Sequence, residues 1–406
     1  MVKDNYIIYL GGSITQSTNL LYLKKKKYKI ILIDLNPNCY CKKYCDILLN
    51  ISQTDIKKIL STLKKVFFKK KFNVIDCFGL AHYSYPAVNK IKLKYVQGSI
   101  DDKFLMKKTF QKKKTKQSPL SPAFQNLPII KKFLDNQKHY WHKIYKFYEE
   151  NDYKIYVKSD GMHQGLGVLE ITDKLTKASF IKKYRQEILD LYKYTDNIYL
   201  EKKVTGKLLN VDFIKKDNGQ VIFLPIIYRD KVIFTNRKKF LSVFQYLDNS
   251  NVIKTKDYEE LRKIIKKVYK GLSTFGTIDM MVNNSNCHII EWSPHFHNSK
   301  IYDFLDNQKV LDIYMDKHKT ATQKTSKGGY IYLHGKNKET KKLINFVKAN
   351  SIKFLEDNIE TNRRKAFLKK YAFIKKKFSL IYFKSNSNSS LLKIANYLEI
   401  NKKLLY

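Results

Sequence analysis

The chain has 406 residues, of which 43% are hydrophobic and 14% are aromatic. This composition excludes global disorder, and the length predicts two or three domains with cores of their own. No apolar run approaches the ~18 residues of a membrane-spanning helix, and the N-terminus lacks the pattern of a secretory signal, so we expect a cytoplasmic protein without a membrane partner.

The formal net charge of +43 raises the question of a nucleic-acid partner. Only six of the 79 basic residues are arginines, whereas proteins that recognise bases depend on the forked guanidinium for bidentate contacts. Lysine is spread along nearly every segment, beside abundant Asn, Ile and Tyr, as a compositional bias would produce. We therefore predict solvated lysine-rich surfaces and no specific nucleic-acid partner. A functional polyanion-binding surface is the weaker alternative.

The five cysteines are an odd number, which argues against a disulfide framework. Cys39, Cys41 and Cys45 lie close together, but they lack the Cys-x-x-Cys spacing of zinc sites and no histidine follows nearby. A structural role is favoured over a metal site for these three. Cys77 and Cys287 lie in or beside apolar runs and are predicted to be in the core.

The first hundred residues alternate between strand-like and helix-like segments. Strands are predicted over residues 5–10, 28–36 and 72–79, with a helix over Thr15–Lys24 and a second helix capped at its N-terminus by Thr54. This alternation predicts a parallel sheet of the α/β class.

A glycine pair, Gly11 and Gly12, directly follows the first predicted strand. A glycine turn at this place can bind a phosphate. The dinucleotide-binding fingerprint G-x-G-x-x-G is nevertheless absent, so we expect either a turn on the substrate side or a purely structural one.

Glycine is most concentrated in "KSDGMHQGLGVLEI", residues 158–171, where Gly161, Gly165 and Gly167 lie between two strand-like runs. The segment predicts a β-hairpin whose loop is either an ordinary glycine turn or a cover over phosphates. Glycines let backbone N–H groups approach a phosphate closely, and Lys158, at the end of the leading strand, would supply positive charge.

A further strand is predicted over "NIYLEKKVTG", residues 197–206. Its segment Glu201–Val204, which includes Lys202, could present both edges of a peptide to an adenine ring. This segment is therefore a candidate for nucleotide binding.

Two carboxylates lie on neighbouring strands that the short turn "NNSN" joins. Asp279 lies in "GTIDMMV" and Glu291 in "HIIEWSP". Two carboxylates that face one point across a hairpin are suited to a hard cation such as Mg²⁺, shared with phosphate oxygens. An amphipathic helix precedes this strand pair, and Asp257 with Glu260 predicts a capping box for it.

The last part of the chain begins with a polar stretch from about residue 316, which predicts a linker. Strands are expected over "GGYIYL" and "FSLIYF", with a helix over Lys338–Lys348 between them and a final helix over "LLKIANYL".

Taken in order, the glycine hairpin, the strand with Glu201 and the acidic strand pair resemble the ATP-grasp superfamily, in its carboxylase-like and amino-acid-ligase-like branch. The segment "DDKFLMKKTF" resembles the helix that opens the family's nucleotide-binding module, where a lysine reaches the nucleotide. Lys103 matches that lysine best and Lys107 is its rival. "EWSPHFHNS" lies where the family usually shows Glu-x-Asn-Pro-Arg.

The resemblance covers nearly the whole chain and implies a fold of the α/β and α+β classes. It implies an N-terminal parallel α/β domain at residues 1–100, an ATP-grasp module of two α+β subdomains at 101–315, and a small C-terminal α+β domain at 316–406. A homodimer is left open as the assembly.

By the same resemblance, the protein is an ADP-forming ligase with ATP and Mg²⁺ as cofactors. A small-molecule carboxylate takes the γ-phosphate to give an acyl phosphate, and an amine then displaces phosphate to form an amide. Lys158 and the glycine loop would screen phosphate charge, while Asp279 and Glu291 would hold Mg²⁺. A bicarbonate-activating, carboxylase-like enzyme and a divergent ATP-binding protein with weakened catalysis are kept as alternatives.

The sequence departs from the family's pattern at three positions. Ser293 replaces the metal-binding Asn, His295 replaces the Arg, and Leu208 stands where a ribose-binding glutamate is expected. Lys158, Arg229 and His295 are the candidate catalytic residues. The candidate receivers of a substrate carboxylate are Arg229, Arg237, His295 and His297.

Overall fold

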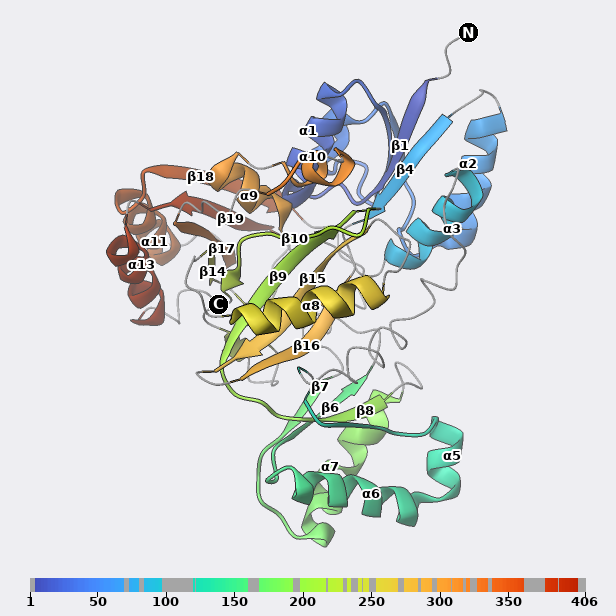
Figure 1. Cartoon of the computed structure of the whole chain (residues 1–406), viewed down its shortest axis with the longest axis vertical. Helices are drawn as coiled ribbons and strands as arrows, with labels where there is room; N and C mark the ends of the chain where they lie inside the picture. The colour runs from blue at the N-terminus through green and yellow to red at the C-terminus, as the bar shows by residue number, and fades with distance from the viewer. Residues whose placement is uncertain are drawn as a thin grey trace.

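The structure is a computed structural model, and it describes residues 4–68, 73–79, 84–96, 120, 122–159, 168–192, 198–216, 218–228, 232–234, 240–242, 244–247, 253–268, 274–283, 286–293, 298–307, 309–316, 319–321, 327–334, 338–360, 377–385 and 387–400. Within these residues the strands form a parallel sheet, a small antiparallel sheet, a large antiparallel sheet and a two-stranded ribbon (Figure 1). None of the helices in this part of the chain combines the length and apolar composition needed to cross a bilayer.

The N-terminal unit is a parallel sheet in the order β3-β2-β1-β4. Ile7 and Tyr9 pack on the side of α1, whereas Ile8 and Leu10 pack on the side of α2 and α3, so the central strand is buried on both faces. The elements are β1 (Asn5–Leu10), η1 (Ile14–Gln16), α1 (Ser17–Lys25), β2 (Lys29–Ile33), η2 (Tyr40–Tyr44), β3 (Ile47–Leu49), α2 (Ile56–Phe68), β4 (Asn73–Gly79) and α3 (Tyr85–Tyr95).

The predicted cap of α2 is wrong by one residue. The Asp55 carboxylate accepts the amide of Lys58 at 3.1 Å, and its carbonyl accepts the amide of Ile59 at 2.9 Å. The Thr54 hydroxyl instead pairs with that of Ser52 at 2.9 Å. Asp55 therefore caps the helix, as expected for a carboxylate beside unpaired amides.

The glycine pair after β1 forms a tight structural turn. Gly11 has a φ of +99°, which a side chain would strain, and a Cβ on Gly12 would lie 2.6 Å from the sulfur of Cys39. The Gly12 amide donates to the Asp34 carboxylate at 2.7 Å. An internal acceptor thus already occupies this amide.

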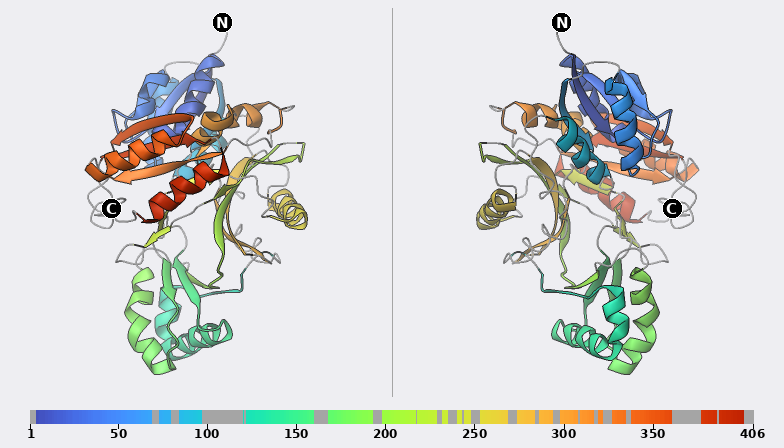
Figure 2. Two further views of the ribbon diagram at one scale, coloured as in Figure 1. Left: turned by 90° about the vertical axis from the view of Figure 1, so that its left-hand side faces the viewer. Right: turned by 90° about the vertical axis from the view of Figure 1, so that its right-hand side faces the viewer.

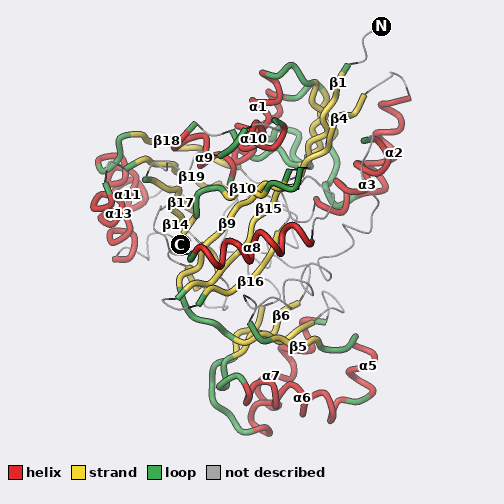
Figure 3. Tube along the Cα trace, in the orientation of Figure 1, coloured by secondary structure: helices red, strands yellow, loops and turns green. Residues whose placement is uncertain are grey.

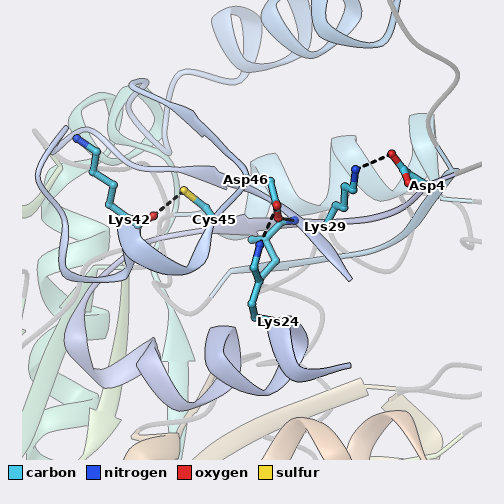
Figure 4. Close-up of polar contacts among 7 residues, drawn as sticks. Asp4, Lys24, Lys29, Lys42, Cys45 and Asp46 are labelled. Atoms are coloured by element: carbon cyan, nitrogen blue, oxygen red, sulfur yellow. Dashed lines mark hydrogen bonds and ion pairs between the residues drawn. The ribbon is translucent and has the colours of Figure 1, made fainter. Parts of the chain in front are cut away.

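Exposed ion pairs orient the rim of the N-terminal unit (Figure 4). Lys29 pairs with Asp4 at 2.8 Å, and Lys24 pairs with Asp46 at 2.8 Å. Asp46 also accepts the amide of Ile30 at 2.8 Å. Because water screens such pairs, they orient these segments more than they stabilise them.

The small antiparallel sheet has the order β5-β8-β6-β7 and carries helices on one face. Its core cluster contains only residues between Leu127 and Leu200 among those described, so it forms a unit with a core of its own. It projects from the rest of the molecule in Figure 2. The elements are β5 (Phe124–Asn126), α5 (Ile130–Asp135), α6 (Gln137–Glu150), β6 (Ile155–Ser159), β7 (Val168–Ile171), α7 (Lys177–Leu191) and β8 (Ile198–Lys202).

The large antiparallel sheet has the order β16-β15-β9-β11-β14-β17-β19-β18, with β10 paired to β9. In Figure 3 its long strands run between the N-terminal unit and the small sheet. The sheet continues across residue 316 because β14 pairs with β17. Its strands are β9 (Lys207–Lys215), β10 (Val221–Phe223), β11 (Ile227–Tyr228), β14 (Phe244–Leu247), β15 (Thr274–Val282), β16 (Cys287–Ser293), β17 (Gly328–His334), β18 (Lys353–Glu360) and β19 (Lys377–Lys384).

Helices complete this part of the fold, and the ribbon of β12 (Val232–Phe234) and β13 (Phe240–Ser242) lies apart from the large sheet's pairing. The predicted capping box of α8 is wrong: Asp257 lies inside the first turn, and its amide and that of Tyr258 donate to the carbonyl of Lys254 at 2.9 and 3.2 Å. The helices are α8 (Thr255–Val268), α9 (Ser299–Asp306), α10 (Val310–Met315), α11 (Lys338–Ala349) and α13 (Asn388–Ile400).

One core cluster joins the N-terminal unit to the large sheet. It includes residues of β1, β4, β9, α9, β17 and β19. The ring of Phe275 in this cluster lies 6.1 Å from that of Phe78 and 5.2 Å from that of Tyr314. Cys77 and Cys287 are buried, as predicted.

Candidate functional site

The predicted glycine hairpin is present as strands β6 and β7. They are antiparallel, and Lys158 pairs with Val168 directly beside the loop. The loop itself, with Gly161, Gly165 and Gly167, lies outside the described residues. Lys158 is therefore held at the loop's base by a regular ladder.

The Lys158 ammonium pairs with the Glu201 carboxylate of β8. Glu201 is 1% exposed and Lys158 is 8% exposed, so both charges are withdrawn from water. The ring of Tyr156, on the same face, lies 5.3 Å from the Lys158 nitrogen, and burial, with the nearby carboxylates of Glu170 and Glu201, raises the pKa of its hydroxyl. This face of the small sheet is polar, while α6 and α7 cover the other.

A linker leads from β8 into the large sheet. The amide of Lys202 donates to Ala123 O at 2.8 Å and that of Lys203 to Lys154 O at 2.9 Å. The Val204 amide has no hydrogen-bond partner among the described residues. The Lys202 ammonium is half-exposed and lies 3.6 Å from the Asp152 carboxylate.

The linker is fixed against the hairpin of β15 and β16. Gly206 has a φ of +152°, and a Cβ there would lie 2.4 Å from the carbonyl oxygen of Val282, so only glycine permits this approach. Beside it, the side-chain amide of Asn283 donates to the Thr205 carbonyl at 3.3 Å. The residues just before β9 are therefore held against the end of β15.

The face of the large sheet beneath α8 is apolar, and the opposite face bears the polar side chains of the candidate site. Alternate residues of β9 and β15 pack with α8 in one core cluster, so their neighbours in sequence point the other way. Antiparallel register aligns residues of β16, β15 and β9 in three rows, which are Ser293–Thr277–Asp212, Glu291–Asp279–Asn210 and His288–Met281–Leu208.

The middle row contains the predicted acidic pair. Asp279 is directly opposite Glu291, and the register shift after Asp279 adds one residue to β16 at Ile290, which keeps both carboxylates on one face. On the other side, the Asn210 side-chain amide donates to Asp279 Oδ1. The prediction that these two acids share one face of a strand pair agrees with this register.

The donor set of the middle row fits Mg²⁺. Among the described residues the buried Asn210 Oδ1 has no hydrogen-bond partner, and its side chain contacts Asp279, which with Glu291 supplies two partly buried carboxylates to the row. The described residues contain no cluster of three or more His, Cys, Asp or Glu side chains, so the protein would supply few ligands. Mg²⁺ suits such a site, because it usually keeps several waters and binds one or two carboxylates together with phosphates.

Other predicted site residues are placed only in part. Ser293 ends β16 in the row beyond Glu291, opposite Thr277. Lys103, Arg229 and His295 lie outside the described residues. Asn210 was not among the predicted site residues, although the alternation in "KLLNVDFIK" separates Asn210 and Asp212 from the apolar core residues Leu209, Val211 and Phe213.

Solved structures match the fold along its length, whereas no family model and no curated protein matches the sequence. N5-carboxyaminoimidazole synthetase from Staphylococcus aureus complexed with ADP has 15% identity and a TM-score of 0.69, over 97% of this chain and 98% of that one. L-amino acid ligase from Bacillus licheniformis has 11% identity and a TM-score of 0.68, over 98% of each chain. Phosphoribosylglycinamide synthetase from Anaerococcus prevotii has 14% identity and a TM-score of 0.63, over 99% of each chain.

This chain has the ATP-grasp fold. The predicted fold class is confirmed, with a parallel N-terminal sheet followed by antiparallel sheets. The polar faces of the small and large sheets, with the Lys158–Glu201 pair on one and the opposed Asp279 and Glu291 on the other, form the candidate site. The division at residues 100 and 316 stays a prediction.

Proposed function

We propose that the protein is an ADP-forming ligase that joins a small-molecule carboxylate to an amine through an acyl phosphate, with ATP and Mg²⁺. One observation carries the proposal: an ATP-grasp fold in which a buried lysine lies on the polar face of one sheet and two opposed carboxylates lie on the polar face of the other. These are the charges that phosphoryl transfer requires.

Each element of the site has a role in the proposal. Lys158 would neutralise phosphate charge, with the backbone of the glycine loop. The linker from Glu201 to Val204 would bind the adenine edge. Asp279 and Glu291 would hold Mg²⁺, which supplies neutralisation of the transferring phosphoryl group. Lys103 is proposed for the nucleotide, Ser293 for the metal, and Arg229 and His295 for the substrate carboxylate.

Activation of bicarbonate is the second candidate. It is favoured by the similarity to structures named N5-carboxyaminoimidazole ribonucleotide synthetase, one of which reaches a TM-score of 0.70 over the full length of this chain at 15% identity. In this case bicarbonate would replace the organic carboxylate as the phosphoryl acceptor, and the same residues would hold Mg²⁺ and ATP.

An ADP-release screen tests both candidates. The full-length protein is incubated with Mg²⁺ and ATP, with amino acids and other carboxylates, each with and without an amine, and with bicarbonate alone. Release that requires an organic carboxylate supports the ligase, and release with bicarbonate alone supports the second candidate. Nucleotide binding without release under any condition contradicts both and indicates a divergent, non-catalytic protein.

A further inference from the structure

The third row of the polar face combines a histidine with apolar side chains. His288 pairs with Met281, and Met281 pairs with Leu208, so the three side chains share one face. Leu208 stands where the family resemblance places a ribose-binding glutamate. The apolar part of this row suits a flat, weakly polar ring, and His288 is its one polar member.

The ring of His288 has no hydrogen-bond partner among the residues that the structure describes, and its Nδ1 is buried. An unpaired polar group of this kind is uncommon in a folded protein, since burial without a partner is unfavourable. Burial and the charge of Lys202 lower the pKa of His288, so the ring is neutral near pH 7 and carries both a donor and an acceptor.

His288 lies between the segment proposed to bind adenine and the acidic pair proposed to bind Mg²⁺. Lys202, whose charge acts on the ring, begins the linker that is proposed to bind adenine. Glu291 lies opposite Asp279 and His288 lies opposite Met281, so the two are two residue steps apart along the sheet, about 7 Å. A ribose at His288 would therefore leave its phosphate chain directed along the sheet toward the acidic pair.

We propose that His288 binds the ribose hydroxyls of the nucleotide. Its side chain would reach the sugar from β16, across Met281, whereas a glutamate at position 208 would reach the same sugar from β9. The inference rests on the proposed ATP binding. A hydroxyl both donates and accepts, so it pairs with either neutral tautomer of the imidazole, and a half-turn of the ring presents either edge to the ligand. Met281 then forms the floor beneath the nucleoside.

Nucleotides that lack one hydroxyl test the contact directly. Binding of ATP, 2′-deoxy-ATP and 3′-deoxy-ATP to the full-length protein is measured by calorimetry, with Mg²⁺ present. The wild type should bind ATP about fivefold to tenfold more tightly than at least one deoxynucleotide, the effect of one neutral hydrogen bond. His288→Ala should weaken ATP binding to the level of that deoxynucleotide and leave the affinity for the deoxynucleotide unchanged.

Two further variants guard the interpretation. His288→Gln keeps a donor and an acceptor and should recover part of the preference for ATP. His142→Ala, on the exposed side of α6, should bind all three nucleotides as the wild type does. Thermal unfolding of each variant checks that the fold is intact.

Other outcomes would overturn the inference. If His288→Ala weakens ATP and both deoxynucleotides equally, the ring contacts the base and not the ribose. If it binds all three with wild-type affinity, His288 lies outside the nucleotide site while the proposed function stands. A wild type that binds no nucleotide would overturn the proposed function together with this inference.

Discussion

The two polar faces of the ATP-grasp fold handle charge in opposite ways. On the small sheet, the Lys158 ammonium and the Glu201 carboxylate neutralise one another at almost complete burial. On the large sheet, the carboxylates of Asp279 and Glu291 lie opposite each other with the same sign, beside the side-chain amide of Asn210. One face thus pairs opposite charges, and the other places two carboxylates opposite each other.

We therefore expect the two faces to differ in what they contribute to stability and to metal-dependent activity. Opposed carboxylates of like charge repel each other, and a cation between them removes that repulsion. The large sheet thus gains most from a metal ion. On the small sheet the Lys158–Glu201 pair balances charge before any ligand binds. Lys158 can therefore act on a phosphate only by sharing its charge between the ligand and Glu201. Mutations on the two faces should therefore separate stability from metal-dependent activity.

The largest expected effect is on stability, at Lys158. Lys158→Ala leaves the Glu201 carboxylate buried without its partner, and breaking a buried pair in this way costs about 3–5 kcal/mol. The free energy of unfolding, measured with denaturant, should fall by that amount. Lys202→Ala, next to Glu201 but half-exposed, serves as the matched control and should change stability little.

A double variant separates the two roles of Lys158. Lys158→Met with Glu201→Gln removes both charges, so it should regain most of the stability while ATP affinity stays low. If Lys158→Ala unfolds at the same denaturant concentration as the wild type, the pair is not buried in solution and the comparison between the faces fails.

Mutation of the acidic pair should affect activity strongly and stability little, the reverse of Lys158→Ala. Asp279→Asn or Glu291→Gln removes one of two repelling charges, so the metal-free protein should unfold no more easily than the wild type. ADP release should fall by about 10²–10³-fold, the effect of losing one contact to the developing charge. The double variant should add little further loss because the two acids act as a unit.

A Mg²⁺ titration gives the measurement for this pair. Each variant is assayed for ADP release, and for the rise in melting temperature that Mg²⁺ with ADP produces in the wild type. Wild-type turnover in both single variants at low Mg²⁺ would contradict the metal site, and with it most of the argument for catalysis.

Asn210 should have a smaller effect through Asp279. Asn210→Ala removes the amide that holds Asp279 Oδ1, and loss of such a supporting contact typically lowers metal affinity about 10–100-fold, of which we expect the lower end. The Mg²⁺ concentration that gives half-maximal ADP release should rise about tenfold, with the rate at saturating Mg²⁺ nearly unchanged. Asn218→Ala, in an exposed turn, is the matched control. An unchanged Mg²⁺ requirement would remove Asn210 from the metal site.

Local signals account for what the sequence could predict. The hairpins around the glycine loop and around "NNSN" follow from alternation and turn residues, and so does the placing of Asp279 opposite Glu291. Pairings between distant segments leave no such signal. The partner of Lys158 is 43 residues away, and the Asn210 amide reaches Asp279 across 69 residues. Neither contact could be predicted without the order of the strands.

Helix boundaries show a second limit. The capping residues expected at a helix start form a local pattern, but neighbouring acceptors compete for the same amides. At α2 the Asp55 carboxylate takes the position predicted for Thr54. At α8 the helix begins before Asp257, because the carbonyl of Lys254 accepts the first amides. The existence of both helices was predictable, and the residue that caps each was decided by this competition.

The smallest expected effect tests whether burial is what distinguishes Lys158. Lys146 and Glu150 form an ion pair on α6 at 3.8 Å, four residues apart, with side chains 66% and 57% exposed. Pairs of this kind stabilise a helix by about 0.3–0.5 kcal/mol, because water screens the attraction. Glu150→Gln should therefore lower the free energy of unfolding by no more than that, and adding salt to about 1 M should abolish the difference from the wild type.

The loss of stability in Lys158→Ala should persist in the same salt, since buried charges are screened far less. Equal salt sensitivity in the two variants would show that water reaches Glu201, and the small sheet would then hold its charges in the same way as an ordinary surface.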